Sequence, residues 1–209
     1  MFFINFKIKK ELKAFKEFKK NYKFDFKKLT EKDGLQYCDG VPLVDENGKE
    51  IGFCDKWVNV GYKLHGPFSK CLSNLFNYEF YFKNKKVNSI ESVFQGIKLK
   101  NKKSQNKAFK YWGMDSNTIK VASDFDWNSS QTVYWQGKPI QRLSQQYDDF
   151  LDELYVSAIQ NPLYRNALKN VPFPYILHSM GTEKKEDTVF TRYEFEFMLN
   201  CLSSYVKQK

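Results

Sequence analysis

Three polar side chains that could do chemistry together share one face of a short amphipathic segment. In NSIESVFQGIKLKN, residues 88–101, Glu91, Gln95 and Lys98 lie at positions i, i+4 and i+7 of a helical repeat. A carboxylate, an amide and an amine on one face can move a proton, bind an anion or stabilise a developing positive charge. Periodicity alone indicates an ordinary solvated helix face, so any chemistry assigned to these residues depends on the rest of the chain.

Other polar residues stand beside aromatic ones further along the chain. They are Asp126-Trp127, Trp135 and His178-Ser179. Taken singly, each has a structural explanation: a loop aspartate next to a core tryptophan, a second tryptophan in the core, and a histidine whose ring nitrogens have hydrogen-bond partners within the fold. Single residues therefore do not identify a site.

Common cofactor and metal motifs are absent from the sequence. It contains no phosphate-binding loop, no GxGxxG, no nucleophile elbow and no cluster of metal-binding residues. The four cysteines are scattered without a CxxC pair, which is typical of free thiols in a reducing compartment. A nucleophilic thiol would need a histidine partner, and only His65 and His178 exist. We therefore expect no cofactor and no metal.

The segment that carries Glu91 is predicted to be a helix with one buried side. Asn88 or Ser89 is a suitable N-cap, which places Glu91 in the first turn, where the helix dipole favours a negative charge. The opposite face repeats apolar residues at helical spacing and would anchor the helix on the core: Ile90, Val93, Phe94 and Ile97.

The remaining elements are predicted from periodicity, caps and turn residues. Helices are predicted at 104–113, at 144–159, from Pro162 onward, and after the Thr191-x-x-Glu194 capping box. Strands are predicted at 58–64, 78–82 and 173–180, with a hairpin at 41–53, a loop at 123–131 and a turn at 134–139. The sum is an α+β fold: a single compact helix-rich domain with a small antiparallel sheet and an N-terminal basic helical arm.

The positive charge is concentrated at the N-terminus. Residues 1–32 contain eleven lysines and four acidic residues, so they carry +7 of the net charge of +10. We assign residues 1–32 to a basic arm and residues 33–209 to the main domain. Within the arm, residues 9–20 form an amphipathic pattern that would dock on the body through Leu12, Phe15 and Phe18. Such an arm could contact DNA, although codon composition would explain the same bias toward lysine and phenylalanine.

No membrane segment or export signal is predicted. The chain has no run of about 18 apolar residues. Its N-terminus, MFFINFKIKK, lacks the order of a signal peptide, in which charge precedes an apolar stretch and a cleavage site. We expect a cytoplasmic protein with no membrane partner.

Several segments, in this order, resemble the NADAR, or YbiA-like, family. That family commonly shows an LSNF segment, a short strand and turn, and then a helix of the form S-x-E-x-x-x-Q-x-x-K. This chain has LSN at 72–74, YEFYFKNKKVNSIESVFQGIKLKN at 78–101 and DW at 126–127. Further on, YWQGKPIQRLSQQYDDFLDELY, LHSMG and TVFTRYEFEFML resemble a subgroup with a YWxGKPI turn and a THSIG…TVLTxxEF ending. The resemblance runs from about residue 60 to the end of the chain.

The resemblance implies an enzyme that cleaves N-glycosidic bonds of ribose-phosphate compounds. The family's helix glutamate, glutamine and lysine fall on Glu91, Gln95 and Lys98, and its aspartate–tryptophan pair falls on Asp126 and Trp127. The chain departs from the family in having SVF at positions 92–94 and HSMG where the better-known subgroup has WGxG. These departures bear on the choice of substrate more than on the type of bond.

The resemblance also assigns roles. Breaking a C1′–N bond builds positive charge on the sugar, which Glu91 would stabilise. Lys98 would protonate the leaving nitrogen, bind phosphate or form a Schiff base with a ring-opened ribose, and Asp126 would hold a sugar hydroxyl or act as a second carboxylate. The tryptophans would stack on a flat base. The substrate-binding residues would be Ser73, Asn74, Gln95, Trp127, Trp135, Lys138, His178 and Ser179.

Three functions are open at this point. The first is a hydrolase that removes ADP-ribose from ADP-ribosylated guanine, in nucleic acid or as a nucleotide. Its implied counterpart is an ADP-ribosyltransferase of a toxin–antitoxin pair. The second is an N-glycosidase acting on ribosylamino phosphate intermediates of riboflavin biosynthesis. The third is a non-catalytic module that binds ADP-ribose or NAD.

Overall fold

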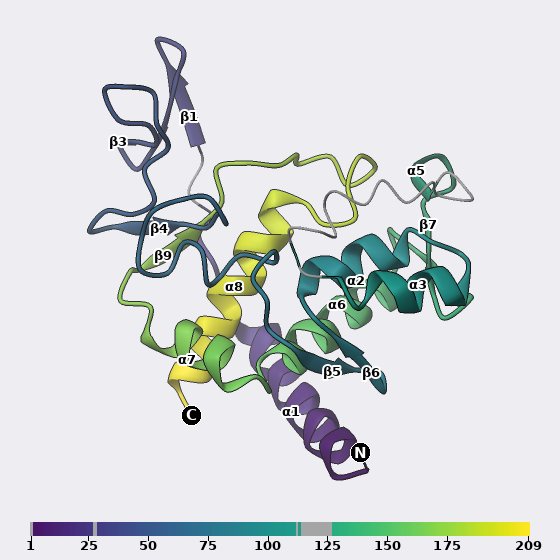
Figure 1. The fold of residues 1–209 in the computed structure, drawn as a ribbon. Coiled ribbons are helices and arrows are strands. Elements are labelled where there is room, and N and C mark those ends of the chain that lie inside the picture. The colour runs from purple at the N-terminus through teal and green to yellow at the C-terminus, as the bar shows by residue number, and fades with distance from the viewer. Residues whose placement is uncertain (1, 27–28, 112, 114–126) are drawn as a thin grey trace.

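Helices are the longest regular elements of the structure, and short strands lie between them in the sequence (Figure 1). The computed structural model describes residues 2–26, 29–111, 113 and 127–209. The helices are α1 (Phe2–Asn21), α2 (Ile90–Ile97), α3 (Lys102–Ala108), α5 (Trp127–Ser130), α6 (Gln145–Ala158), α7 (Pro162–Asn170) and α8 (Arg192–Lys207). The strands are β1 (Leu29–Lys32), β2 (Leu35–Cys38), β3 (Val41–Pro42), β4 (Trp57–Asn59), β5 (Phe80–Phe82), β6 (Lys85–Val87), β7 (Thr132–Trp135), β8 (Lys138–Gln141) and β9 (Tyr175–Leu177).

The strands form small, separate sheets. β1, β2 and β3 make one antiparallel sheet, and β5–β6 and β7–β8 make two antiparallel hairpins. β4 and β9 pair in parallel, which joins segments more than 100 residues apart. The α+β class with small antiparallel sheets is therefore confirmed, and the parallel pair is an addition to it.

Each hairpin turns through two residues with positive φ, the conformation of a type I′ turn. Asp33 and Gly34 have φ of 52° and 75°, and Lys83 and Asn84 have φ of 45° and 65°. The hairpin expected at 41–53 is reduced to one bridge between Val44 and Glu50. There the Asp45 carboxylate accepts bonds from two backbone N–H groups, which closes a tight loop in place of a two-residue turn.

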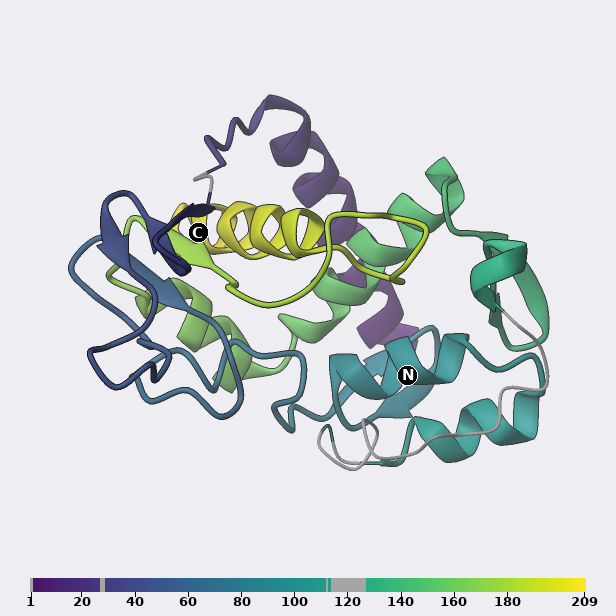
Figure 2. The same cartoon turned by 90° about the horizontal axis from the view of Figure 1, so that it is seen from above.

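The core lies around α6 and α8. Their inward faces are buried together with the inner sides of α1, α2 and α7. Both views place the β1–β2–β3 sheet at one end of the molecule and α3, α5 and β7 at the other (Figures 1 and 2). Among the described residues, no helix is both long and apolar enough to cross a membrane.

The N-terminal helix is part of the packed structure. α1 covers a longer segment than the expected 9–20, and Phe15 on its inner face is fully buried. Lys16 and Lys19 of α1 form ion pairs with Asp149 and Asp152 of α6. Two of the lysines counted in the basic arm are therefore used to dock this helix on α6.

The short helix α2 is capped and anchored as predicted. Ser89 is its N-cap, and its side chain forms a capping box with Ser92. The four predicted anchor residues of the apolar face are buried. A Cβ added to Gly96 would lie 2.4 Å from the Phe109 ring, so glycine at this position permits the close packing of Phe109 against α2. This packing fixes the side of α2 that carries Glu91.

Candidate functional site

The polar face of α2 forms a continuous hydrogen-bonded chain. Gln95 Nε2 donates to Glu91 Oε1 at 2.6 Å, and Lys98 Nζ donates to Gln95 Oε1 at 3.3 Å. All three side chains are partly buried. The amide therefore joins the carboxylate to the amine, so this face of the helix is not an ordinary solvated surface.

These residues line a cavity of about 230 Å³. One wall comes from residues 73–75 and α2. The other comes from His178, Met180, Gly181 and the segment that leads into α8. Six of the predicted site residues meet there: Ser73, Asn74, Glu91, Gln95, Lys98 and His178. Segments that are far apart in the sequence thus converge on one cavity.

Asn74 is held so that its amide nitrogen is available to a ligand. Its backbone carbonyl accepts from the Glu91 N–H at 2.9 Å, and its Oδ1 accepts from the Tyr155 hydroxyl at 2.8 Å. Because the oxygen is occupied by Tyr155, the side chain can offer its NH₂ donors to the cavity. Asn74 therefore both positions the start of α2 and supplies a donor.

His178 is held as a neutral ring. It follows β9, and its Nδ1 lies 2.6 Å from the carbonyl oxygen of Val60, next to β4. A carbonyl can only accept, so Nδ1 carries the proton and Nε2 is an acceptor. Burial lowers the pKa of His178, which favours this neutral form.

Burial moves the pKa values of the acid and the amine toward each other. It raises the pKa of Glu91, while the Gln95 hydrogen bond and the charge of Lys98 act in the opposite direction. It lowers the pKa of Lys98, against the effect of the Glu91 charge. A carboxylate of raised pKa is a better proton acceptor, and an ammonium of lowered pKa is a better proton donor.

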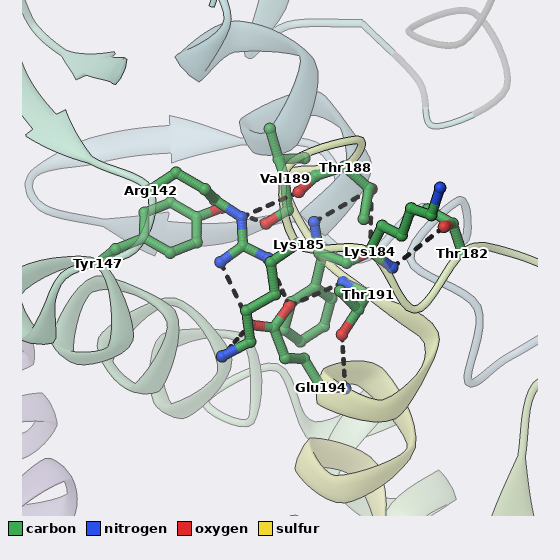
Figure 3. Close-up of polar contacts among 10 residues, drawn as sticks. Arg142, Tyr147, Thr182, Lys184, Lys185, Thr188, Val189, Thr191 and Glu194 are labelled. Atoms are coloured by element: carbon green, nitrogen blue, oxygen red, sulfur yellow. Dashed lines mark hydrogen bonds and ion pairs between the residues drawn. The ribbon is translucent and has the colours of Figure 1, made fainter. Parts of the chain in front are cut away.

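The second wall includes residues 188–191, the end of the pre-α8 loop (residues 182–191), which Arg142 fastens to the body (Figure 3). The buried Arg142 donates from Nε to the Thr188 carbonyl at 2.9 Å. Its two terminal nitrogens donate to the two oxygens of Glu194, at 3.2 and 2.6 Å. Glu194 in turn accepts from the Thr191 N–H in the capping box of α8. The wall and the start of α8 are thereby held by one guanidinium.

A second ion-pair group lies beside His178. Arg192 lines the cavity and pairs with Glu183 and, through Nη1 at 3.0 Å, with Glu196. Glu196 also accepts from the backbone N–H of His178, and burial raises the pKa of Glu196 to about 7. Sequence reasoning missed Arg142 and Arg192 because an arginine beside a helix start carries no spacing signal of its own.

The other predicted site residues lie elsewhere or have structural partners. Trp127 sits in α5 with its ring centre 5.8 Å from Lys98 Nζ, and Trp135 packs against Phe82, Phe109 and Phe150. Lys138 is exposed at the start of β8.

Ser179 bonds to Asn59 and to the Glu50 carboxylate. Asp126 lies outside the described residues. Within the described ranges, no three His, Cys, Asp or Glu side chains gather as a metal site would require.

The comparison with known families corrects the resemblance to NADAR. The family described as bacteriophage protein GP30.3 matches residues 67–204, about two thirds of the 209-residue chain. No curated protein and no solved structure matches the chain. The NADAR assignment is therefore wrong: its short motifs follow helix periodicity and turn residues, which unrelated folds share. By the match over residues 67–204, this chain belongs to the family of bacteriophage protein GP30.3.

Proposed function

We propose that the cavity binds a ribose-phosphate compound and hydrolyses its N-glycosidic bond. The observation that carries this proposal is the chain Glu91–Gln95–Lys98 at the cavity wall. Oε1 of Glu91 is occupied by Gln95, whereas no described residue bonds to Oε2. One carboxylate oxygen is thus oriented by the protein, and the other is left for a substrate or a water molecule.

The reaction needs the two functions that this pair supplies. As the C1′–N bond breaks, its electron pair moves to nitrogen and positive charge builds on the sugar. The Glu91 carboxylate stabilises that charge and accepts a proton from the water that attacks C1′. The Lys98 ammonium gives a proton to the leaving nitrogen. The products are a sugar with a free 1-hydroxyl and a base carrying N–H.

The rest of the cavity suits a sugar phosphate. Asn74 offers amide donors, and Ser73, whose Oγ accepts from the Leu75 N–H, can donate its own hydroxyl hydrogen. His178 Nε2 can accept from a sugar hydroxyl, and Lys98 can also attract phosphate. ADP-ribosylated guanine, as a nucleotide or in nucleic acid, is the first substrate to test, and ribosylamino phosphates are the second.

The test is turnover by the wild-type protein and by Glu91→Gln. Each is incubated with a guanine-ADP-ribosylated oligonucleotide, ribosylamino phosphates and NAD, and released base and sugar are followed by mass spectrometry. We expect hydrolysis of one substrate by the wild type and a loss of about 10³-fold or more in Glu91→Gln, because glutamine keeps the shape but cannot accept the proton.

Glu79→Gln is the matched control. Glu79 pairs with Lys86 on the surface, outside the cavity, so this variant should keep full activity. Equal activity of Glu91→Gln and the wild type would overturn the assignment of Glu91. Tight ADP-ribose binding without turnover of any substrate would show a non-catalytic binding module instead.

A further inference from the structure

A second cluster of positive charge lies next to the cavity. From Lys98 to Lys110 the sequence contains six lysines, and it contains no aspartate or glutamate from position 92 to position 114. The cluster falls within residues 67–204, the part of the chain shared with the family, whereas the basic arm lies outside that part. This local cluster of lysines is separate from the basic arm at residues 1–32, which holds most of the net charge of the chain.

Four of these lysines form an exposed surface, here called the α3 basic face: Lys102, Lys103, Lys107 and Lys110. Lys103, Lys107 and Lys110 follow the spacing i, i+4 and i+7 along α3 and its end, so they project from one side. None of the four forms an ion pair with any residue that the structure describes. Their charge is therefore available to an external anion.

This face is fixed relative to the cavity. Gln105 on the inner side of α3 donates to the carbonyls of Leu99 and Tyr134, and its Oε1 accepts from the backbone N–H of Gln136. These bonds join the end of α2, α3 and the β7–β8 hairpin. Figure 1 shows α2 and α3 side by side at the end of the molecule that also holds β7 and α5.

Two further lysines, which precede α3 in the sequence, each lie beside an aromatic ring. The Lys100 amine is 5.7 Å from the ring centre of Tyr134, and the Lys98 amine is 5.8 Å from that of Trp127. Both rings are partly exposed. Alternation of cations with aromatic rings is the arrangement that binds unpaired nucleotides, because phosphates meet the cations and bases stack on the rings.

We propose that the α3 basic face binds the backbone of a single-stranded nucleic acid, one nucleotide of which enters the cavity. Lys103 and Lys110 are about 10 Å apart along α3 and its end at 1.5 Å per residue, so these lysines can contact successive phosphates of one strand. A base that reacts inside a cavity must leave its stack, which favours an unpaired strand over a duplex. This inference rests on the proposed function and gives its substrate as a nucleotide within a strand.

The test is binding of a fluorescein-labelled 15-nucleotide oligothymidine and of a duplex of equal length, by anisotropy at several salt concentrations. One variant replaces the four lysines of the α3 basic face by glutamine. The matched control replaces four lysines of α1 by glutamine, with the same change in net charge: Lys7, Lys9, Lys10 and Lys13.

We expect the single strand to bind more tightly than the duplex. The α3 variant should weaken binding at least about 10-fold and reduce the slope of log K against log salt by about 2 to 3. The α1 control should change affinity by less than about 2-fold. Circular dichroism and thermal unfolding verify that both variants are folded.

Equal losses in the two variants would overturn the proposal, since binding would then follow net charge alone. A preference for the duplex would overturn it as well. The Glu91→Gln variant separates this inference from the proposed function. Strand binding without hydrolysis of any substrate keeps the α3 basic face and refutes the enzyme. Hydrolysis of free nucleotides without strand binding supports the enzyme and refutes strand binding by the α3 basic face.

Discussion

At the scale of residues, Gln95 couples the two groups on which the proposed reaction depends. Its amide donates to Glu91 and accepts from Lys98, so it holds both side chains on the same face of α2. An amide has the two complementary ends that this position needs. A glutamate at position 95 would repel Glu91, and a leucine would release both neighbours.

The pH dependence of hydrolysis should reflect the environments of Glu91 and Lys98. Activity needs an ionised Glu91, so it falls when acid protonates this residue, and it needs a protonated Lys98, so it falls when base removes that proton. Burial raises the first pKa above its ordinary 4.5 and lowers the second below its ordinary 10.5. The profile of kcat/KM against pH should therefore be bell-shaped. Its acidic limb should lie above pH 4.5 and its alkaline limb below pH 10.5.

The variant Lys98→Arg provides the check on the alkaline limb. A guanidinium stays protonated throughout, so any remaining activity should lose its alkaline limb. An alkaline limb unchanged in this variant would show that a different group titrates there.

The sequence predicted the part of the candidate site that lies on one helix. Glu91, Gln95 and Lys98 could be found because helical spacing places them together, and Ser89 could be found as a cap. The role of His178 depends on a bond to Val60, 118 residues away, which no local pattern reveals. Trp135 matched a motif, but its ring packs against three phenylalanines.

At the scale of elements, the pre-α8 loop depends on Arg142 for its position. Arg142 directly follows β8 in the sequence. Its side chain, however, donates hydrogen bonds to the pre-α8 loop and to the first turn of α8. The ring of Tyr147 lies 4.8 Å from the guanidinium. Three elements thus meet at one side chain, and one wall of the cavity depends on them.

Replacing Arg142 by methionine should destabilise the protein by about 3 kcal/mol. The change removes the guanidinium that the Glu194 carboxylate and the Thr188 carbonyl share in a largely buried place. Urea unfolding measures the loss, and hydrogen exchange should be faster in residues 182–191.

Arg165→Met is the comparison for this prediction. Arg165 lies 3.7 Å from Glu11 and is more exposed, so its loss should cost less than about 1 kcal/mol. Similar unfolding curves for the two variants would contradict the anchoring role of Arg142.

Long elements were predictable and short ones were less so. α6 and α8 follow helical periodicity and begin at caps that the sequence shows, Ser144 and Thr191. β1 and β2 are four residues each and mostly exposed, so they have little apolar alternation to detect. Neither of these strands was therefore predicted from the sequence.

At the scale of the whole molecule, α1 completes the core. Its Phe15 ring lies edge-on to Tyr205 of α8, with ring centres 5.4 Å apart, and it is fully buried. The sequence predicted docking through this residue, because the phenylalanines share one side of the amphipathic pattern. The lysines of the same helix indicated a basic arm that could contact DNA. Two of them instead form ion pairs that hold α1 against α6.

Replacing Phe15 by alanine should lower the free energy of unfolding by about 3–5 kcal/mol, through lost burial and the cavity that remains. Phe6 is 67% exposed on the same helix, so Phe6→Ala should cost less than about 1 kcal/mol. Chemical denaturation of both variants measures the difference. If Phe15→Ala unfolded like the wild type, α1 would not be an integral part of the core.

The order of synthesis gives a last consequence of the parallel pairing between β4 and β9. β4 is made early, but its partner strand, His178 and the pre-α8 loop all come from the last third of the chain. A nascent chain on the ribosome therefore carries Glu91 and Lys98 long before it has the opposite wall of the cavity. The cavity can form only when α8 has emerged, so polypeptides interrupted before that point should lack one of its walls.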